Sequence, residues 1–455
     1  MTMPPRMAHV ANILVAGAII VLLGLRITGT DVPLLFWQIT ASLCFLANLD
    51  RMNGVAKTFF AIAVLIWIAG ALHLSEIAPS ATNASSSFFM FILIMGFLSY
   101  TTERSRRIST FFAGLRSTSG LRKYVTLNLQ TFLLSLILNV GSVHLLAPLA
   151  IRRGEEGADQ PELRRQALAI IRGFGVTPLW SPLSIAPLLV TSLVAGVSYR
   201  ELLLPGLIIS AGMLLLGWVM ERALMRGKPA PEARQTPRTR PDYGVLATLL
   251  SVVACISVIA LAAGHFLKTS TIESISFAVF STAFTWALGQ GLFAQPATRI
   301  LAEISAITRR TSREGIMISS VVIMSATVAE ISRHVNLAEM HTSVLGSSLI
   351  AAVIPAVFLA GGALAINPTV TASLLAAFLA PGWPTGGGLW LAVAMVWGWS
   401  MTVSFGPFTG SSLAVSSAVG TSSFVMTYRW NRGYTLTVLS IASPVLFLGT
   451  WLAIS

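Results

Sequence analysis

Long apolar runs recur along almost the whole chain, and they constrain its fold more than any other feature. A helix needs about 20 apolar residues to cross a bilayer, and several runs reach or approach that length. The candidate spans lie near residues 9–26, 33–48, 57–75, 87–102, 124–149, 165–196, 203–220, 244–267, 271–292, 315–330, 342–366, 387–422 and 434–454. No small-residue cleavage site follows the first run before Arg26, so we expect it to remain as a signal anchor.

Charged residues are scarce in the chain as a whole. Only 10% of the 455 residues are charged, 55% are hydrophobic, and the mean hydropathy is +0.78. Soluble proteins carry about 25% charged residues, so a soluble enzyme, a disordered chain and a nucleic-acid module are excluded. The net charge of +13 is typical of basic cytoplasmic loops. Cys44 and Cys255 lie in apolar runs, which leaves neither a disulfide framework nor a metal cluster.

A basic, proline-rich segment divides the chain into two halves of similar length. Residues 221–243 contain four prolines and six basic residues, which indicates a solvated linker. Two further basic stretches, 102–123 and 297–315, precede apolar runs, and we interpret them as interfacial amphipathic helices.

The two halves contain similar landmarks in the same order, as in transporters built from internal repeats. TERSRR at 102–107 is similar to AEISRH at 329–334. From Glu103 to Asn139 is 36 residues, and from Glu330 to Asn367 is 37. A proline follows in each half: Pro182 within WSPLSIAP and Pro407 within FGPFTG. The Glu103–Arg106 and Glu330–Arg333 spacings also predict an ion-pair clamp at the end of each span.

The distribution of charge favours an inverted arrangement of these repeats. If each Asn lies at the tip of a re-entrant hairpin, the chain has about 11 transmembrane helices. One face then receives 26 of the 30 Lys and Arg residues and is predicted to be cytoplasmic, with the N-terminus. Residues 150–172 belong to that face, and the C-terminus lies outside. We therefore predict an all-α integral membrane protein of a bacterial inner (plasma) membrane.

The predicted domains follow from the repeats. They are N-terminal scaffold helices (1–86), a first repeat core (87–221) with a hairpin near Asn139 and a broken helix near 177–187, a basic cytoplasmic linker (222–243), scaffold helices of the second half (244–314), and a second repeat core (315–455) with a hairpin near Asn367 and a broken helix near 404–412.

The broken segments are the candidate site. Irregular backbone at membrane depth persists only where it lines a cavity or is buried in protein. Freed carbonyls and hydroxyls suit Na⁺, and half-helix N-termini suit anions. Close packing of small residues is the alternative explanation for each segment alone. The candidate substrate- and ion-binding residues are Asn139, Gly141, Ser142, Thr177, Trp180, Ser181, Pro182, Asn367, Thr369, Pro407, Thr409, Ser411 and Ser412.

One family shares this arrangement. Thr177, Pro178, Ser181 and Pro182 follow Gly175 where that family has a Thr-Pro-Ile-Gly-Thr-Pro-Pro-Asn stretch, and Asn139 and Asn367 match its hairpin-tip Asn residues. The residues beside each Asn differ from the family's Ser and Thr. The chain resembles the ion transporter superfamily, particularly its divalent anion/sodium symporters, whose relatives include arsenite pumps and sodium/proton antiporters. The resemblance implies alternating access and a homodimer.

We therefore expect a secondary active transporter of a small, anionic, carboxylate-like solute, coupled to Na⁺ or H⁺, with no other cofactor. His144, five residues after Asn139, is the candidate for proton coupling, although a structural role is the alternative. A cation/proton antiporter or an arsenite-type oxyanion exporter is the alternative function. A membrane-embedded enzyme is less favoured, and a passive channel stays open. The expected partners are the solute and the lipid bilayer, with no nucleic acid.

Overall fold

The computed structural model describes residues 3–71, 79–105, 120–150, 160–226, 243–334 and 343–455, and all regular structure in them is helical. Seven of these helices are long and apolar enough to cross a membrane. They are Pro5–Ile27, Ala81–Glu103, Tyr199–Met225, Thr271–Gly289, Val344–Ala363, Gly388–Val419 and Arg432–Ile454.

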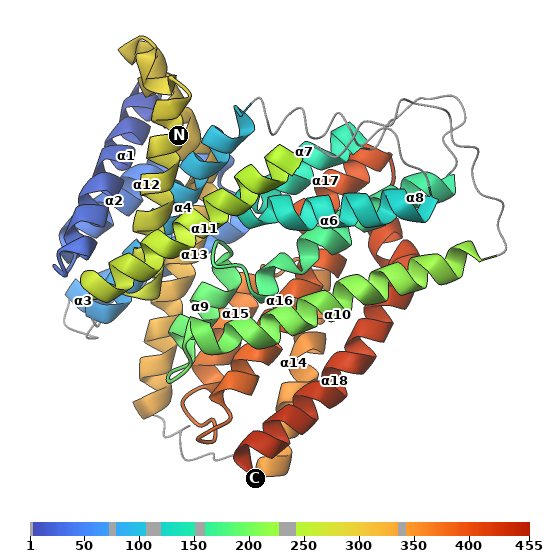
Figure 1. Ribbon diagram of the computed structural model, residues 1–455. Helices are drawn as coiled ribbons and strands as arrows, with labels where there is room; N and C mark the ends of the chain where they lie inside the picture. The colour runs from blue at the N-terminus through green and yellow to red at the C-terminus, as the bar shows by residue number, and fades with distance from the viewer. Residues whose placement is uncertain (1–2, 72–78, 106–119, 151–159, 227–242, 335–342) are drawn as a thin grey trace. The chain divides into compact units, whose positions relative to one another are not determined.

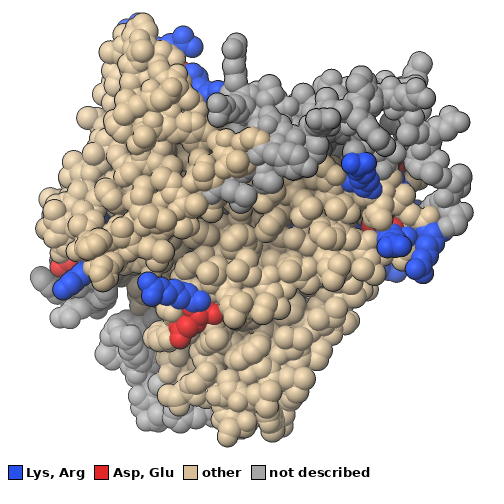
Figure 2. Space-filling view, in the orientation of Figure 1, with Lys and Arg blue, Asp and Glu red and all other residues tan. Residues whose placement is uncertain are grey.

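Large apolar side chains also lie on the surface, for example Leu452, which is 76% exposed. The face in Figure 2 shows few charged side chains, with broad uncharged areas between them. Extensive exposed apolar surface is costly in water and expected against lipid. The protein is therefore an all-α, membrane-embedded protein.

The chain forms two compact units, each made of two separate stretches of sequence. Unit 1 comprises Met1–Ser105 and Leu250–His334, and unit 2 comprises Arg106–Leu249 and Val335–Ser455. Unit 1 contains α1 (Pro5–Ile27), α2 (Leu34–Ala47), η1 (Leu49–Arg51), α3 (Gly54–Ala71), α4 (Pro79–Glu103), α12 (Thr271–Gly289), η4 (Leu292–Ala294) and α13 (Ala297–His334), and α11 (Tyr243–Phe266) begins in unit 2 and continues into unit 1.

Helix α13 is the longest element of unit 1 and packs along α4, α3 and α1 (Figure 1). The sequence predicts an interfacial helix followed by a separate span, but α13 runs through both as one helix of 38 residues. No proline interrupts it, and Gly315 faces Phe89, whose Cδ2 lies only 3.0 Å from where a Cβ would stand. Ser85 Oγ donates to the carbonyl of Ser319 at 2.9 Å, which fixes the two helices against each other.

Glu103, at the end of α4, forms an ion pair with α13. Arg310 donates to both carboxylate oxygens of Glu103, at 2.9 and 2.8 Å. Bidentate geometry of this kind favours a guanidinium over other donors. Arg106 and the side chains of Glu330 and Arg333, which the predicted clamps need, lie outside the described residues.

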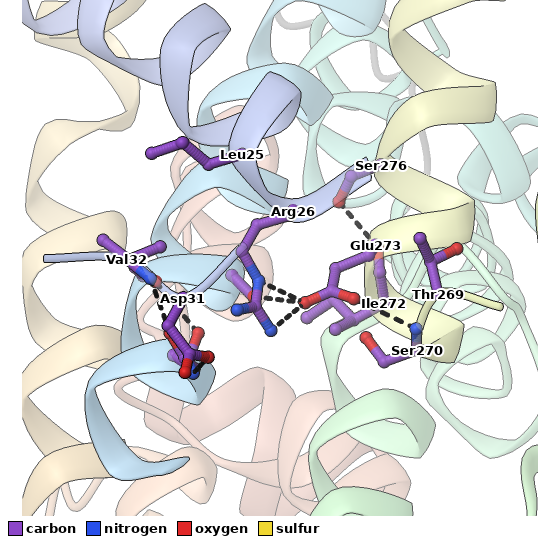
Figure 3. A network of polar contacts seen from close by, with 12 residues as sticks. Leu25, Arg26, Asp31, Val32, Thr269, Ser270, Ile272, Glu273 and Ser276 are labelled. Carbon is purple, nitrogen blue, oxygen red and sulfur yellow. Dashed lines mark hydrogen bonds and ion pairs between the residues drawn. The ribbon is translucent and has the colours of Figure 1, made fainter. Parts of the chain in front are cut away.

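A polar cluster joins three helices of unit 1 where α1 ends and α12 begins (Figure 3). The guanidinium of Arg26 forms an ion pair with Glu273, which is almost fully buried. Ser87 Oγ donates to the same carboxylate at 3.1 Å, and the backbone N–H of Ser270 donates to it at 3.0 Å. Glu273 thus caps its own helix and ties α12 to α1 and α4.

Unit 2 contains the segments that the sequence singles out. Its elements are α6 (Gly120–Leu138), α7 (Val140–Ala150), α8 (Gln160–Gly175), η3 (Thr177–Leu179), α9 (Ile185–Leu193), α10 (Tyr199–Met225), α14 (Val344–Ala363), α15 (Pro368–Leu379), α16 (Gly388–Phe405), α17 (Gly410–Val419), η6 (Val425–Trp430) and α18 (Arg432–Ile454). Helices α14, α16 and α18 pack side by side, and α6 packs along α8 (Figure 1). The predicted repeat cores include α4 and the end of α13, which belong to unit 1.

Candidate functional site

The first interrupted helix consists of α8, the short turn η3 and α9. Regular α-helix stops at Gly175 and resumes at Ile185. Pro178 and Pro182 lie in the interval and have no N–H to donate, so an α-helical ladder cannot continue through it. Ser181 stabilises the irregular part, because its N–H donates to the carbonyl of Thr177 at 3.1 Å and its Oγ accepts from Leu183 N at 3.3 Å.

The second interrupted helix consists of α16 and α17, with Pro407 buried between them. Thr409 caps α17 by accepting a hydrogen bond from the N–H of Ser412 at 3.3 Å. Ser411 Oγ donates back to the carbonyl of Val403 at 2.9 Å. Hydroxyl side chains therefore supply the hydrogen bonds that the helix loses where it stops.

The two interrupted helices cross each other inside unit 2. Ser400 Oγ, on α16, donates to the carbonyl of Gly175, the last residue of α8, at 2.5 Å. A Cβ at position 175 would lie 1.5 Å from Ser404 Oγ, so only glycine permits this approach. The C-terminal ends of α8 and α16 consequently meet at one point, which we call the crossing.

Helix α10 covers the first interruption from another side. A Cβ at Gly206 would lie 2.2 Å from the carbonyl oxygen of Leu179, which shows how closely α10 approaches η3. Ser210, one turn further along α10, donates from Oγ to the carbonyl of Val176 at 3.2 Å. The irregular backbone around η3 is thus buried in protein at these contacts.

Several polar side chains in the interrupted helices are buried and have no hydrogen-bond partner among the described residues. These are the hydroxyls of Thr177 and Ser412, and the indole N–H of Trp180. The hydroxyl of Ser373, on α15, is in the same state. Buried polar groups normally have partners, so groups that lack one are candidates for binding a ligand. The ring of Trp180 packs against Phe132, with centroids 5.8 Å apart.

The first predicted hairpin tip is a tight turn between α6 and α7. Asn139 alone joins the two helices, with a φ of 49° in the left-handed region that Asn tolerates better than most residues. Its carbonyl accepts from Ser142 Oγ at 2.7 Å, and Ser142 Oγ also lies 2.7 Å from Ser135 Oγ. Gly141 lies in the first turn of α7, and the side chain of His144, further along that helix, is exposed.

The second predicted tip connects α14 to α15. Asn367 caps α15, because its side-chain oxygen accepts from the N–H of Thr369 at 2.9 Å, and Thr369 itself is buried. Ala365, two residues earlier, has a φ of 62° and reverses the chain. Both Asn residues therefore have a local structural function in their hairpins, whatever else they contact.

The structure brings some of the predicted site residues together and leaves others in their own hairpins. Helix α7 of the first hairpin packs on α17, and α15 of the second packs against α9. Each hairpin thus lies beside the interrupted helix from the other half of the sequence. The hydrogen bonds observed for Ser142 and Asn367 stay within their own hairpins.

Sequence reasoning missed Arg172, which it assigned to the cytoplasmic stretch 150–172. Arg172 lies in the last turn of α8 and is only 4% exposed. Its Nε donates to Oδ1 of Asn431 at 2.8 Å, and its NH1 donates to the hydroxyl of Tyr124 at 3.1 Å. The guanidinium also lies over the ring of Tyr434, 4.3 Å from its centroid. The available signal was a single arginine followed closely by apolar residues in AIIRGFGV.

No protein-family model matches this sequence, and no curated protein is significantly similar to it. The function is therefore inferred from the interrupted helices and hairpins of unit 2.

Proposed function

We propose that this protein is a secondary active transporter of a small, carboxylate-like anion, and that its solute site lies at the crossing in unit 2. The observation that most supports this proposal is the contact between α8 and α16, in which Ser400 donates a hydrogen bond to the carbonyl of Gly175. Interrupted helices that meet inside a membrane protein are how many transporters form a solute site near the midplane. The unpartnered hydroxyls of Thr177 and Ser412 are available to such a solute.

An anion fits the helix N-termini and hydroxyls that follow the crossing better than a proton or metal cation does. The carboxylates that are buried in the described residues are Glu221 and Glu273, and Glu273 lies in unit 1. Glu221 is paired with Arg165 on α8. A proton antiporter needs an ionisable group at its site, whereas helix N-termini and hydroxyls serve an anion. The N-termini of α9 and α17 each follow an interruption.

Two inverted repeats account for the order of elements in unit 2. A hairpin, an interrupted helix and a long helix follow one another as α6–α7, α8–α9 and α10. The same series recurs as α14–α15, α16–α17 and α18. With the apolar helices of unit 1, this gives about 11 crossings, an N-terminus in the cytoplasm and a C-terminus outside. It is the arrangement of the ion transporter superfamily, in which one part moves against a dimeric scaffold, and we assign these parts to unit 2 and unit 1.

Ligand-dependent thermal stability tests the proposal. Purified protein is heated with di- and tricarboxylates, sulfate or arsenite, because a ligand of the native state raises the melting temperature. We expect one class of anion to stabilise the wild type, and this shift to shrink in the double variant Thr177→Val/Ser412→Ala. Thr437→Val, at a half-buried position on α18, is the matched control and should keep the shift.

Stabilisation by arsenite alone would favour an oxyanion exporter instead. If no anion alters the melting temperature, or if the double variant keeps the full shift, the crossing is not the solute site.

A further inference from the structure

The crossing collects negative charge from two helix ends. The C-terminal end of an α-helix carries a partial charge of about −0.5. Gly175 ends α8 and Phe405 ends α16, and the contact of Gly175 with Ser404 brings these two ends together inside unit 2. Two such ends amount to roughly one unit of negative charge in a buried place. In other transporters with interrupted helices, Na⁺ or H⁺ occupies half-helix C-terminal ends.

Arg172 places one positive charge beside these ends. It belongs to the last turn of α8, where a cation complements the helix dipole. Unlike lysine or histidine, an arginine stays charged in any protein environment. Its hydrogen bonds to Asn431 and Tyr124 and its position over Tyr434 hold the guanidinium in one place.

Asn431 connects this charge to the second helix end. It accepts from Arg172 Nε through Oδ1 and donates through Nδ2 to the carbonyl of Ser404, in the last turn of α16, at 3.5 Å. Asn431 directly follows the π-helix η6, and its own N–H donates to the carbonyl of Met426, five residues back. Local π-helical geometry is uncommon and often found at functional sites.

Arg172 has neutral hydrogen-bond partners and forms no ion pair with any described carboxylate. Glu221, the buried carboxylate of unit 2, is engaged by Arg165, with Nε and Oε1 2.9 Å apart. A buried charge without compensation is strongly destabilising. The two helix ends supply the compensation that a carboxylate would supply elsewhere.

We propose that the guanidinium of Arg172 takes the place of a coupling sodium ion at the crossing, so that this protein functions without Na⁺. The proposal rests on the transport function proposed above and removes one of its two candidate coupling ions. A second cation at the same helix ends would be repelled by the guanidinium. The carbonyls of Gly175 and Val403 also already accept from the hydroxyls of Ser400 and Ser411.

The test compares the melting temperature of the purified full-length protein in NaCl and in choline chloride at equal ionic strength, with no solute added. The variants are Arg172→Met, which removes the charge, and Arg172→Lys, which keeps it. Arg222→Met, at an exposed position on α10, is the control. A ligand present at about 100 times its Kd raises the melting temperature by several degrees.

We expect equal melting temperatures in the two salts for the wild type, Arg172→Lys and Arg222→Met. Arg172→Met should melt lower in choline and regain part of the loss in Na⁺, because a small cation can then reach the helix ends. Sodium stabilisation of the wild type would overturn the proposal, and so would an Arg172→Met variant that does not respond to Na⁺.

If Arg172→Met cannot be purified in a folded state, binding of ²²Na⁺ to the wild type decides. Absence of saturable binding supports the proposal, and saturable binding overturns it. Because neither measurement uses the solute, a failure of this inference is distinct from a failure to find any anion that binds.

Discussion

Ser400 donates a hydrogen bond of 2.5 Å from its Oγ to the carbonyl oxygen of Gly175, although the two residues are 225 positions apart in the sequence. This contact joins the end of one interrupted helix to the last turns of the other. It depends on the absence of a side chain at position 175, because Ser404 occupies the space that a Cβ would need. The candidate site thus depends on a glycine, two serines and the places where two helices stop.

Replacing Gly175 should therefore be far more damaging than a typical glycine-to-alanine change. A Cβ 1.5 Å from Ser404 Oγ must displace α16, and overpacking of this kind costs about 1–3 kcal/mol or more. Gly212→Ala is the matched control, since a Cβ there meets nothing within 4 Å on α10. We expect Gly175→Ala to lower the melting temperature and Gly212→Ala to leave it unchanged or raise it. Equal effects of the two changes would contradict the close crossing.

Substitutions of Asn139 can distinguish a structural role in the turn from a role in binding solute. Its φ of 49° costs alanine about 1–2 kcal/mol but costs glycine little. Asn139→Gly should fold as stably as the wild type, whereas Asn139→Ala should melt lower. If the side chain binds solute, both variants lose solute-dependent stabilisation. Solute-dependent stabilisation that survives in Asn139→Gly would reduce Asn139 to a turn residue.

Asn367 can be tested in the same way through its capping function. Asn367→Ser keeps an N-cap acceptor for the N–H of Thr369, whereas Asn367→Ala removes it at a cost of about 1 kcal/mol. Denaturation of both variants should show the loss only in the alanine variant. If both variants bind and transport solute normally, Asn367 does not belong to the site.

The ion pair of Arg26 with Glu273 should contribute far more to stability than the surface pairs of unit 1. Removing one partner of a buried pair costs about 3–5 kcal/mol, so Glu273→Ala should strongly destabilise the protein. Asp50→Asn breaks the more exposed pair with Arg309 and should cost less than about 1 kcal/mol. Chemical denaturation compares the two variants. A loss for Glu273→Ala no larger than that for Asp50→Asn would show that the cluster in Figure 3 is not a clamp.

His144 is the candidate for proton coupling if sodium is excluded. Its side chain is exposed on α7, and histidine is the side chain whose ordinary charge change falls between about pH 5 and 8. His144→Gln should abolish the pH dependence of uptake into proteoliposomes, whereas His265→Gln, at an exposed position on α11, should keep it. An unchanged pH profile in His144→Gln would discard this role.

The sequence predicts the membrane class and the positions of the irregular segments better than it predicts contacts. Apolar length identifies α1, α10 and α18, and Pro178, Pro182 and Pro407 mark the intervals where helices stop, because each effect is local. The partner of Glu103 is Arg310, which no spacing rule within one helix can indicate. The continuity of α13 was missed because its basic first half resembles a separate interfacial helix.

Arg172 was missed for a related reason. Charge counting assigns an arginine to the nearest polar stretch, and residues 150–172 contain several others. Its burial depends on Tyr124, Asn431 and Tyr434, which come from distant helices. Ser400 was equally hidden, because only the approach of α8 gives it a function.

Uptake of the stabilising anion into proteoliposomes tests the central claim most directly. The wild type, Thr177→Val/Ser412→Ala and Thr437→Val are reconstituted at equal density, and uptake of the labelled anion is followed in choline salts with an imposed pH gradient. The account predicts saturable uptake by the wild type and Thr437→Val, and a large loss in the double variant. Uptake by the double variant at the wild-type rate would show that the solute does not pass through the crossing.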